Sequence, residues 1–149
     1  MKTMREDFVE AMQDADLIGS SWEAYLPMPQ QHLVEGQKHE FKTCRCPMMV
    51  WVLRHIDHDE FDHYVDDRNM VHGEIVAHVL GVKTTDVASY ITEYDDRYKD
   101  VVHSIFKRGW GTAEAAWNAN CVEAARVLAV RCFDRHFAGV AELPAPAVR

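Results

Sequence analysis

Apolar residues recur at three- and four-residue spacing through most of the chain, which predicts an all-α protein. The clearest case is residues 73–91, where two apolar stretches are separated by Gly81. The apolar positions are Ile75, Val76, Val79 and Leu80 before the glycine, and Val87, Tyr90 and Ile91 after it. Glycine favours the left-handed conformation that follows many helix ends. The pattern predicts a helix, a tight turn, and a second helix capped by Thr84 or Thr85.

Three helices are predicted before this pair. Thr3 and Glu6 form a capping box, which starts a helix at Met4 that runs to about residue 18. Pro47 suits the first turn of a helix that continues through the apolar run to residue 56. The acidic segment 57–69 contains one short helix with Phe61, Tyr64 and Val65 on its apolar face, and Asn69 is expected to cap the helix that follows.

Two more helical segments are predicted after residue 91. One continues from residue 91 or restarts at Asp95 and ends near Arg108. The other is the longest, from Ala113 to about Phe137, and it is so apolar that it needs cover from the domain or from a second copy of the chain. We therefore expect one helical domain over residues 1–142 and a disordered tail over 143–149.

The paired helices within residues 70–93 resemble the helix-turn-helix of bacterial and phage DNA-binding proteins. The resemblance is carried by Ala77, Leu80, Gly81, Val82 and Val87 and is limited to residues 73–91. It implies that the outward side of the second helix enters the major groove of DNA, and that the protein works as a homodimer on paired half-sites. The residues it places on the DNA-binding surface are Lys83, Thr84, Thr85, Ala88, Ser89 and Thr92. Hydroxyl groups, methyl groups and a lysine can contact bases and phosphates there.

The net charge of −8 argues against a nonspecific nucleic-acid binder, because phosphates attract Lys and Arg. Residues 1–81 carry 7 Lys and Arg against 15 Asp and Glu, whereas residues 82–149 carry 9 of each. Asp86, Glu93, Asp95 and Asp96 lie in or just after the predicted recognition helix and oppose DNA binding. An alternative interpretation is therefore an acidic interaction module or inhibitor that binds a basic protein surface, such as that of a nucleic-acid-handling protein.

Metal binding and catalysis have little support in the sequence. His55, His58 and His63 lie among aspartates, and Cys44 and Cys46 lie near histidines, but neither spacing matches a standard metal site. No strained serine elbow or phosphate-binding glycine loop is present, so we expect no enzyme, cofactor or metal. The N-terminal residues lack a signal-peptide core, and no apolar run would span a membrane, which together predict a cytoplasmic protein with reduced cysteines.

Overall fold

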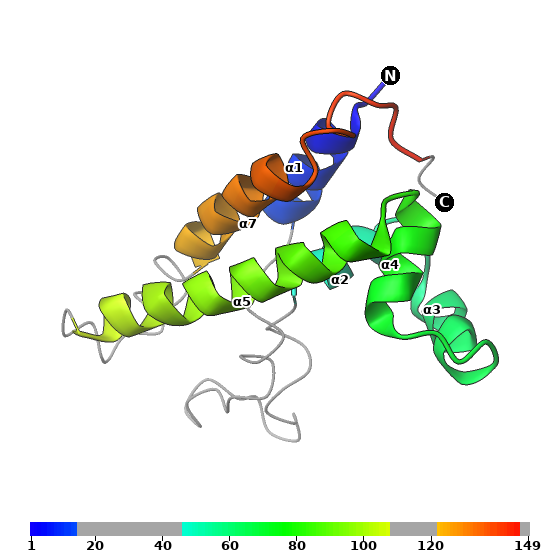
Figure 1. The fold of residues 1–149 in the computed structure, drawn as a ribbon, viewed down its shortest axis with the longest axis horizontal. Coiled ribbons are helices and arrows are strands. Elements are labelled where there is room, and N and C mark those ends of the chain that lie inside the picture. The colour runs from blue at the N-terminus through cyan, green and yellow to red at the C-terminus, as the bar shows by residue number, and fades with distance from the viewer. Residues whose placement is uncertain (15–45, 108–121, 147–149) are drawn as a thin grey trace.

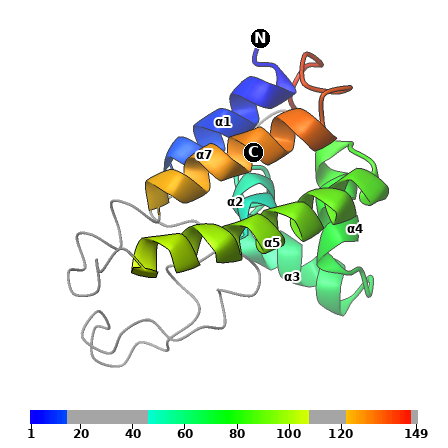
Figure 2. The same ribbon diagram turned by 60° about the vertical axis from the view of Figure 1, so that its left-hand side comes forward.

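The helix near the C-terminus, α7 (Val122–His136), lies between two others: α1 (Met4–Asp14) packs on one side of it and the long helix α5 (Thr84–Lys107) on the other (Figures 1 and 2). This arrangement is seen in a computed structural model, which describes residues 1–14, 46–107 and 122–146. The helices are α1 (Met4–Asp14), α2 (Pro47–Val52), α3 (His58–Asp66), α4 (His72–Leu80), α5 (Thr84–Lys107) and α7 (Val122–His136). Within the described ranges there is no β-strand, only an isolated bridge between Thr3 and Pro144, so the all-α prediction is confirmed.

The core is an aromatic cluster contributed by four helices. Phe8 of α1 stacks on Phe133 of α7 with 4.7 Å between ring centroids, and Trp51 of α2 meets Phe8 edge-on at 5.2 Å. Tyr90 of α5 lies 5.7 Å from Phe137, just beyond α7. All five side chains are almost fully buried. Because such rings bury large areas and prefer edge or offset contacts, they determine how the helices sit against one another.

Helix α1 begins as its sequence predicts. The Glu6 backbone N–H donates to Thr3 Oγ1 at 3.2 Å, and the Thr3 backbone N–H donates to Glu6 Oε1 at 3.2 Å. The described helix ends at Asp14, and the predicted extension to residue 18 lies outside the described residues.

Helix α2 is shorter than the sequence predicts. It ends at Val52, and residues 53–56 form tight turns instead, with the backbone N–H of Arg54 donating to Trp51 O and that of His55 to Val52 O. The prediction that this helix continues to residue 56 is wrong. The side chain of His55 contacts Asp7 of α1, and this tertiary contact competes with regular helix there. Helix α3 then begins beside Asp57, whose carboxylate accepts from the Glu60 backbone N–H at 2.7 Å, so the predicted short helix is confirmed.

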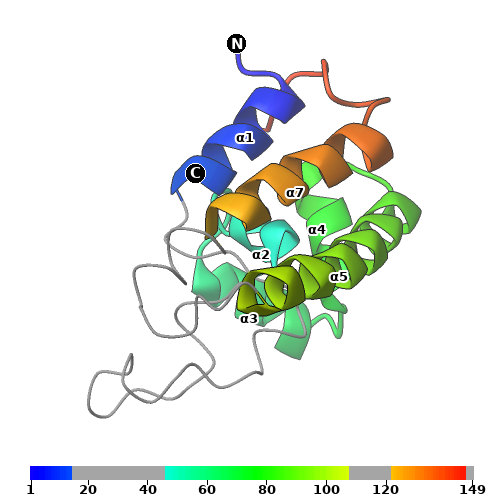
Figure 3. The ribbon, with the colours of Figure 1, turned by 90° about the vertical axis from the view of Figure 1, so that its left-hand side faces the viewer.

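Helices α3, α4 and the start of α5 gather at one end of the molecule (Figures 1 and 3). Helix α4 contacts α2, α3 and α5. The prediction that Asn69 caps α4 is wrong: the cap position is Val71, whose N–H donates to Glu74 Oε1 at 3.4 Å, and Asn69 adopts a left-handed φ of 53°. Asparagine tolerates that conformation better than most residues, which explains its place in the turn.

The described part of the C-terminal segment packs against the N-terminus. Met4 N–H donates to Leu143 O at 2.8 Å and Ala145 N–H donates to Lys2 O at 2.9 Å. Residues 143–146, predicted as part of a disordered tail, thus belong to the folded part of the chain. No helix in the described ranges is long and apolar enough to cross a membrane.

Candidate interaction surface

The turn between α4 and α5 has the geometry that its sequence predicts. Gly81 has φ 71° and ψ 30°, and its N–H donates to Ala77 O at 2.9 Å, closing the end of α4. A Cβ at Gly81 would meet nothing within 4 Å, so the glycine is required by its backbone conformation rather than by crowding. Helix α5 starts at Thr84, which makes Lys83 the cap residue in place of the predicted threonine.

One face of α5 is fixed against the core by a column of tyrosines. Tyr90, Tyr94 and Tyr98 are buried at four-residue intervals and stack along the helix, with 6.0 and 5.8 Å between successive ring centroids. The Tyr90 hydroxyl donates to Ala129 O of α7 at 2.9 Å, and burial raises the Tyr90 pKa well above its usual value. With Val87 also buried, this face determines which side of α5 points outward.

Five of the six residues that the sequence assigns to a DNA-binding surface lie on α5, and the sixth, Lys83, directly precedes it. Each of them is exposed in the structure: Lys83, Thr84, Thr85, Ala88, Ser89 and Thr92. Three of them also line an open hollow of about 750 Å³ on α5. Its described lining residues are Ala88, Ser89, Thr92, Glu93, Asp96, Arg97 and Asp100. The described lining of the hollow therefore consists of three small side chains, three acids and one arginine.

At one edge of the hollow, Glu93 contacts basic side chains from two helices. Its carboxylate lies 3.4 Å from Arg97 Nε, 3.2 Å from Arg135 Nε and 3.1 Å from His136 Nε2. Burial alone would raise the Glu93 pKa, but the hydrogen bond with His136 and the charge of Arg135 outweigh it and lower that pKa. The Glu93 carboxylate thus links Arg97 of α5 to Arg135 of α7 and compensates part of their positive charge. The partners from α7 were not predicted from the sequence.

Asp96 and Asp100 are exposed on the same hollow. Among the described residues neither of them makes an ion pair. Asp100 was not recognised in the sequence as part of this surface, although its four-residue spacing from Asp96 places both on one side of the helix. Among the described residues, Glu93 is therefore compensated by two arginines, whereas Asp96 and Asp100 are not compensated.

Helix α3 presents a second acidic face beside α4. Its exposed acids include Asp59, Asp62 and Asp66, and His63 Nδ1 lies 2.6 Å from Asp67 Oδ2 at its C-terminal end. Residues 57–92 contain eight Asp and Glu against two basic residues. The helix pair that resembles a DNA-binding unit is therefore flanked by negative charge.

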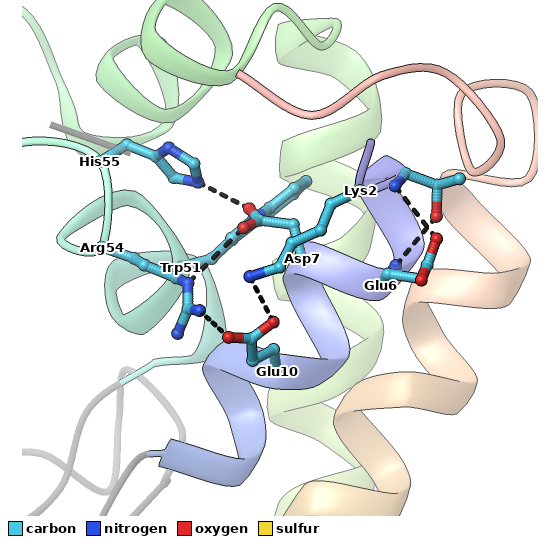
Figure 4. A network of polar contacts seen from close by, with 8 residues as sticks. Lys2, Glu6, Asp7, Glu10, Trp51, Arg54 and His55 are labelled. Atoms are coloured by element: carbon cyan, nitrogen blue, oxygen red, sulfur yellow. Dashed lines mark hydrogen bonds and ion pairs between the residues drawn. The ribbon is translucent and has the colours of Figure 1, made fainter. Parts of the chain in front are cut away.

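A buried polar network links α1 to α2 and is shown in Figure 4. Asp7, with a side chain 1% exposed, accepts a hydrogen bond from Trp51 Nε1 at 2.8 Å and lies 2.6 Å from His55 Nε2. Arg54 Nε lies 3.5 Å from the other Asp7 oxygen, and Arg54 also pairs with Glu10 at 2.5 Å. These contacts connect His55, in the turn after α2, to α1.

Both described cysteines belong to the buried core. Cys46 and Cys132 are both buried and free, and burial raises the pKa of each to about 12. No group of three or more His, Cys, Asp or Glu in the described part of the chain is arranged to hold a metal ion. Cys44, considered above with Cys46 as a metal ligand, lies outside the described residues.

Comparisons with known proteins found no matching family, no matching curated protein and no matching solved structure. The functional interpretation consequently depends on the chemistry of the surface.

Proposed function

We propose that this protein is an acidic binding module that engages a positively charged surface of a partner protein through α3 and the outward side of α5. The observation that carries the proposal is the pair of exposed carboxylates on the α5 hollow, Asp96 and Asp100, neither of which forms an ion pair with a described residue. The third acid, Glu93, is already paired with Arg97 and Arg135. Complementary charge speeds encounter with a basic surface and disfavours a negatively charged one.

The surroundings of the hollow favour the same class of partner. Helix α3 adds exposed carboxylates next to α4, and residues 57–92 contain only Arg68 and Lys83 as Lys or Arg side chains. A partner that itself handles nucleic acid has a basic surface of the required kind, and binding to this module would cover that surface and exclude the nucleic acid. The module would then act as an inhibitor.

The test compares a basic and an acidic ligand on the same protein. Fluorescein-labelled protein is titrated with an arginine decapeptide and, separately, with a random-sequence DNA duplex pool, each at two salt concentrations, and anisotropy is followed. We expect the peptide to bind, more weakly at the higher salt, and the duplex pool not to bind. Binding of the duplex without binding of the peptide would reject the acidic module.

A second candidate is a sequence-specific DNA-binding regulator of bacterial or phage type, cytoplasmic and acting as a dimer. It is supported by the left-handed Gly81 turn and by the exposure of the six predicted contact residues at the start of α5. Between Lys83 and Thr92 the only acid is Asp86, which is half-buried, so the first turns of α5 carry no net charge. Rounds of selection from the same duplex pool test it: an enriched sequence bound less tightly at higher salt would favour this candidate.

A further inference from the structure

Four exposed histidines are interleaved with the carboxylates of α3 and α4. Two lie on each helix: His58, His63, His72 and His78. His63 Nδ1 lies 2.6 Å from Asp67 Oδ2, just after α3. The two histidines of α4 contact aromatic rings of α3, with 5.2 Å between the ring centroids of His72 and Phe61 and 5.4 Å between those of His78 and Tyr64. These imidazoles therefore lie at the same end of the molecule as the acidic face of α3 (Figures 1 and 3).

The net charge of this part of the chain depends on the four imidazoles. Residues 57–92 contain eight Asp and Glu against two Lys and Arg, which gives a net charge of −6 when the histidines are neutral. Histidine is the side chain that ordinarily changes charge between about pH 5 and 8, whereas carboxylates ordinarily stay ionised above about pH 5. Protonation of all four histidines reduces the net charge of residues 57–92 to −2. Mild acid thus removes most of the negative charge without neutralising the carboxylates.

The other charged groups around the histidines are mostly acids. Arg68 Cζ lies 5.4 Å from the centroid of the Tyr64 ring, which His78 also contacts. Of the elements that pack against α4, α2 has no titratable side chain, and the start of α5 contributes Lys83 and Asp86. The remaining titratable groups of α3, α4 and their ends are Asp57, Asp59, Glu60, Asp62, Tyr64, Asp66, Asp67 and Glu74. Each proton that a histidine gains therefore cancels negative charge that attracts a basic partner.

We propose that a fall in pH weakens binding of the basic partner to this acidic face, with the four histidines as the groups that gain charge. The inference rests on the proposed function and adds its regulation. A partner whose charge comes from arginine stays fully charged over this pH range. Since such a partner disfavours protonated histidines, binding and protonation oppose each other, and formation of the complex near the middle of the range releases protons.

The test measures binding of the arginine decapeptide to the full-length protein by isothermal titration calorimetry at about pH 7.5 and about pH 5.5, at constant ionic strength. We expect the affinity to be about tenfold lower at the lower pH, because each exposed charge contributes little and four of them change. At about pH 6.5, in buffers that differ in ionisation enthalpy, peptide binding should release protons. Circular dichroism at both pH values should show the same helix content.

Substitutions at the same four positions separate the imidazoles from every other titrating group. Replacing all four by glutamine, which is neutral at any pH, should reduce the ratio of the two affinities from about tenfold to below about twofold. Replacing all four by arginine, which is always charged, should make binding weak at both pH values. His58→Gln with His63→Gln keeps the ring contacts of α4, and it should lower the ratio to about threefold even where the larger variants fold poorly.

The possible results distinguish failure of this inference from failure of the proposed function. Equal affinity of the parent protein at both pH values, or an unchanged ratio in the glutamine variants, would overturn the pH dependence and leave the acidic module in place. Loss of helix content in the parent at the lower pH would also overturn it, because unfolding would then explain the weaker binding. No binding of the decapeptide even at the higher pH would instead reject the acidic module itself.

Discussion

Replacing Asp7 by alanine tests whether the buried network of α1 and α2 stabilises the fold. The change removes the acceptor for Trp51 Nε1 and the partner of His55 Nε2, which lie 2.8 and 2.6 Å from the carboxylate. Leaving one buried donor unsatisfied costs about 1–3 kcal/mol, and this substitution leaves two of them, Trp51 Nε1 and His55 Nε2. We therefore expect a loss of about 4 kcal/mol in the free energy of unfolding.

Urea denaturation followed by far-ultraviolet circular dichroism measures this loss as a fall in the midpoint at unchanged slope. For a chain of this size the same loss lowers the melting temperature by roughly 10–15 °C. Glu10→Gln is the control, because Glu10 belongs to the same network but is 42% exposed and pairs with Lys2 and Arg54 in contact with solvent. Its effect should be small.

A double variant should recover part of the lost stability. Replacing Asp7 and His55 together by leucine removes a charged acceptor and one of its partners, so the double variant should be more stable than the sum of the two single losses implies. If Asp7→Ala unfolds at the same urea concentration as Glu10→Gln, the network contributes little and the burial argument is wrong.

Three further predictions follow from α5 and its surroundings. Gly81→Val should lower the free energy of unfolding by about 1–3 kcal/mol because φ at this position is 71°; an added Cβ meets no neighbour, so the cost comes from the backbone conformation. Gly81→Asn should cost less, because asparagine tolerates this conformation better. Equal melting temperatures of the valine variant and the parent would contradict the turn. Burial raises the pKa of Cys46 and Cys132 from 9.0 to about 12, so the stability that is fully present below pH 9 should fall as the pH rises toward 12. Alkylation at pH 8 followed by peptide mapping should label neither thiol before the protein unfolds. Thr85→Ala with Ser89→Ala should leave the melting temperature nearly unchanged and weaken binding to any selected DNA site, and unchanged affinity would exclude the two hydroxyls from recognition.

Features encoded within a few residues could be predicted from the sequence. The Thr3–Glu6 capping box and the turn at Gly81 depend on local hydrogen bonds and backbone preferences, so their residue types are sufficient. The buried face of α5 was likewise readable, because Tyr90 and Tyr94 repeat at helical spacing. Local encoding therefore predicted the helices and the outward side of α5.

Features that join distant segments could not be predicted in this way. Asp7 lies 48 residues from His55, and Glu93 lies 43 from His136, so nothing in the sequence indicates that either pair meets. The same contacts explain the early end of α2, where the position of His55 depends on α1. A clue was nevertheless present, since Asp7 falls within the apolar face of α1 between Met4 and Ala11, where an acid needs a buried partner.

The two candidate functions use overlapping parts of α5, and one variant separates them. Asp96→Asn with Asp100→Asn removes two negative charges next to Ser89 and Thr92, which belong to both surfaces. The arginine decapeptide loses two attractive carboxylates, whereas a DNA duplex loses two groups that repel its phosphates. Peptide affinity should therefore fall and any DNA affinity should rise, most clearly at low salt because exposed charges are screened as salt increases. A variant that binds a selected duplex more tightly and the peptide equally well would show that this side of α5 faces DNA.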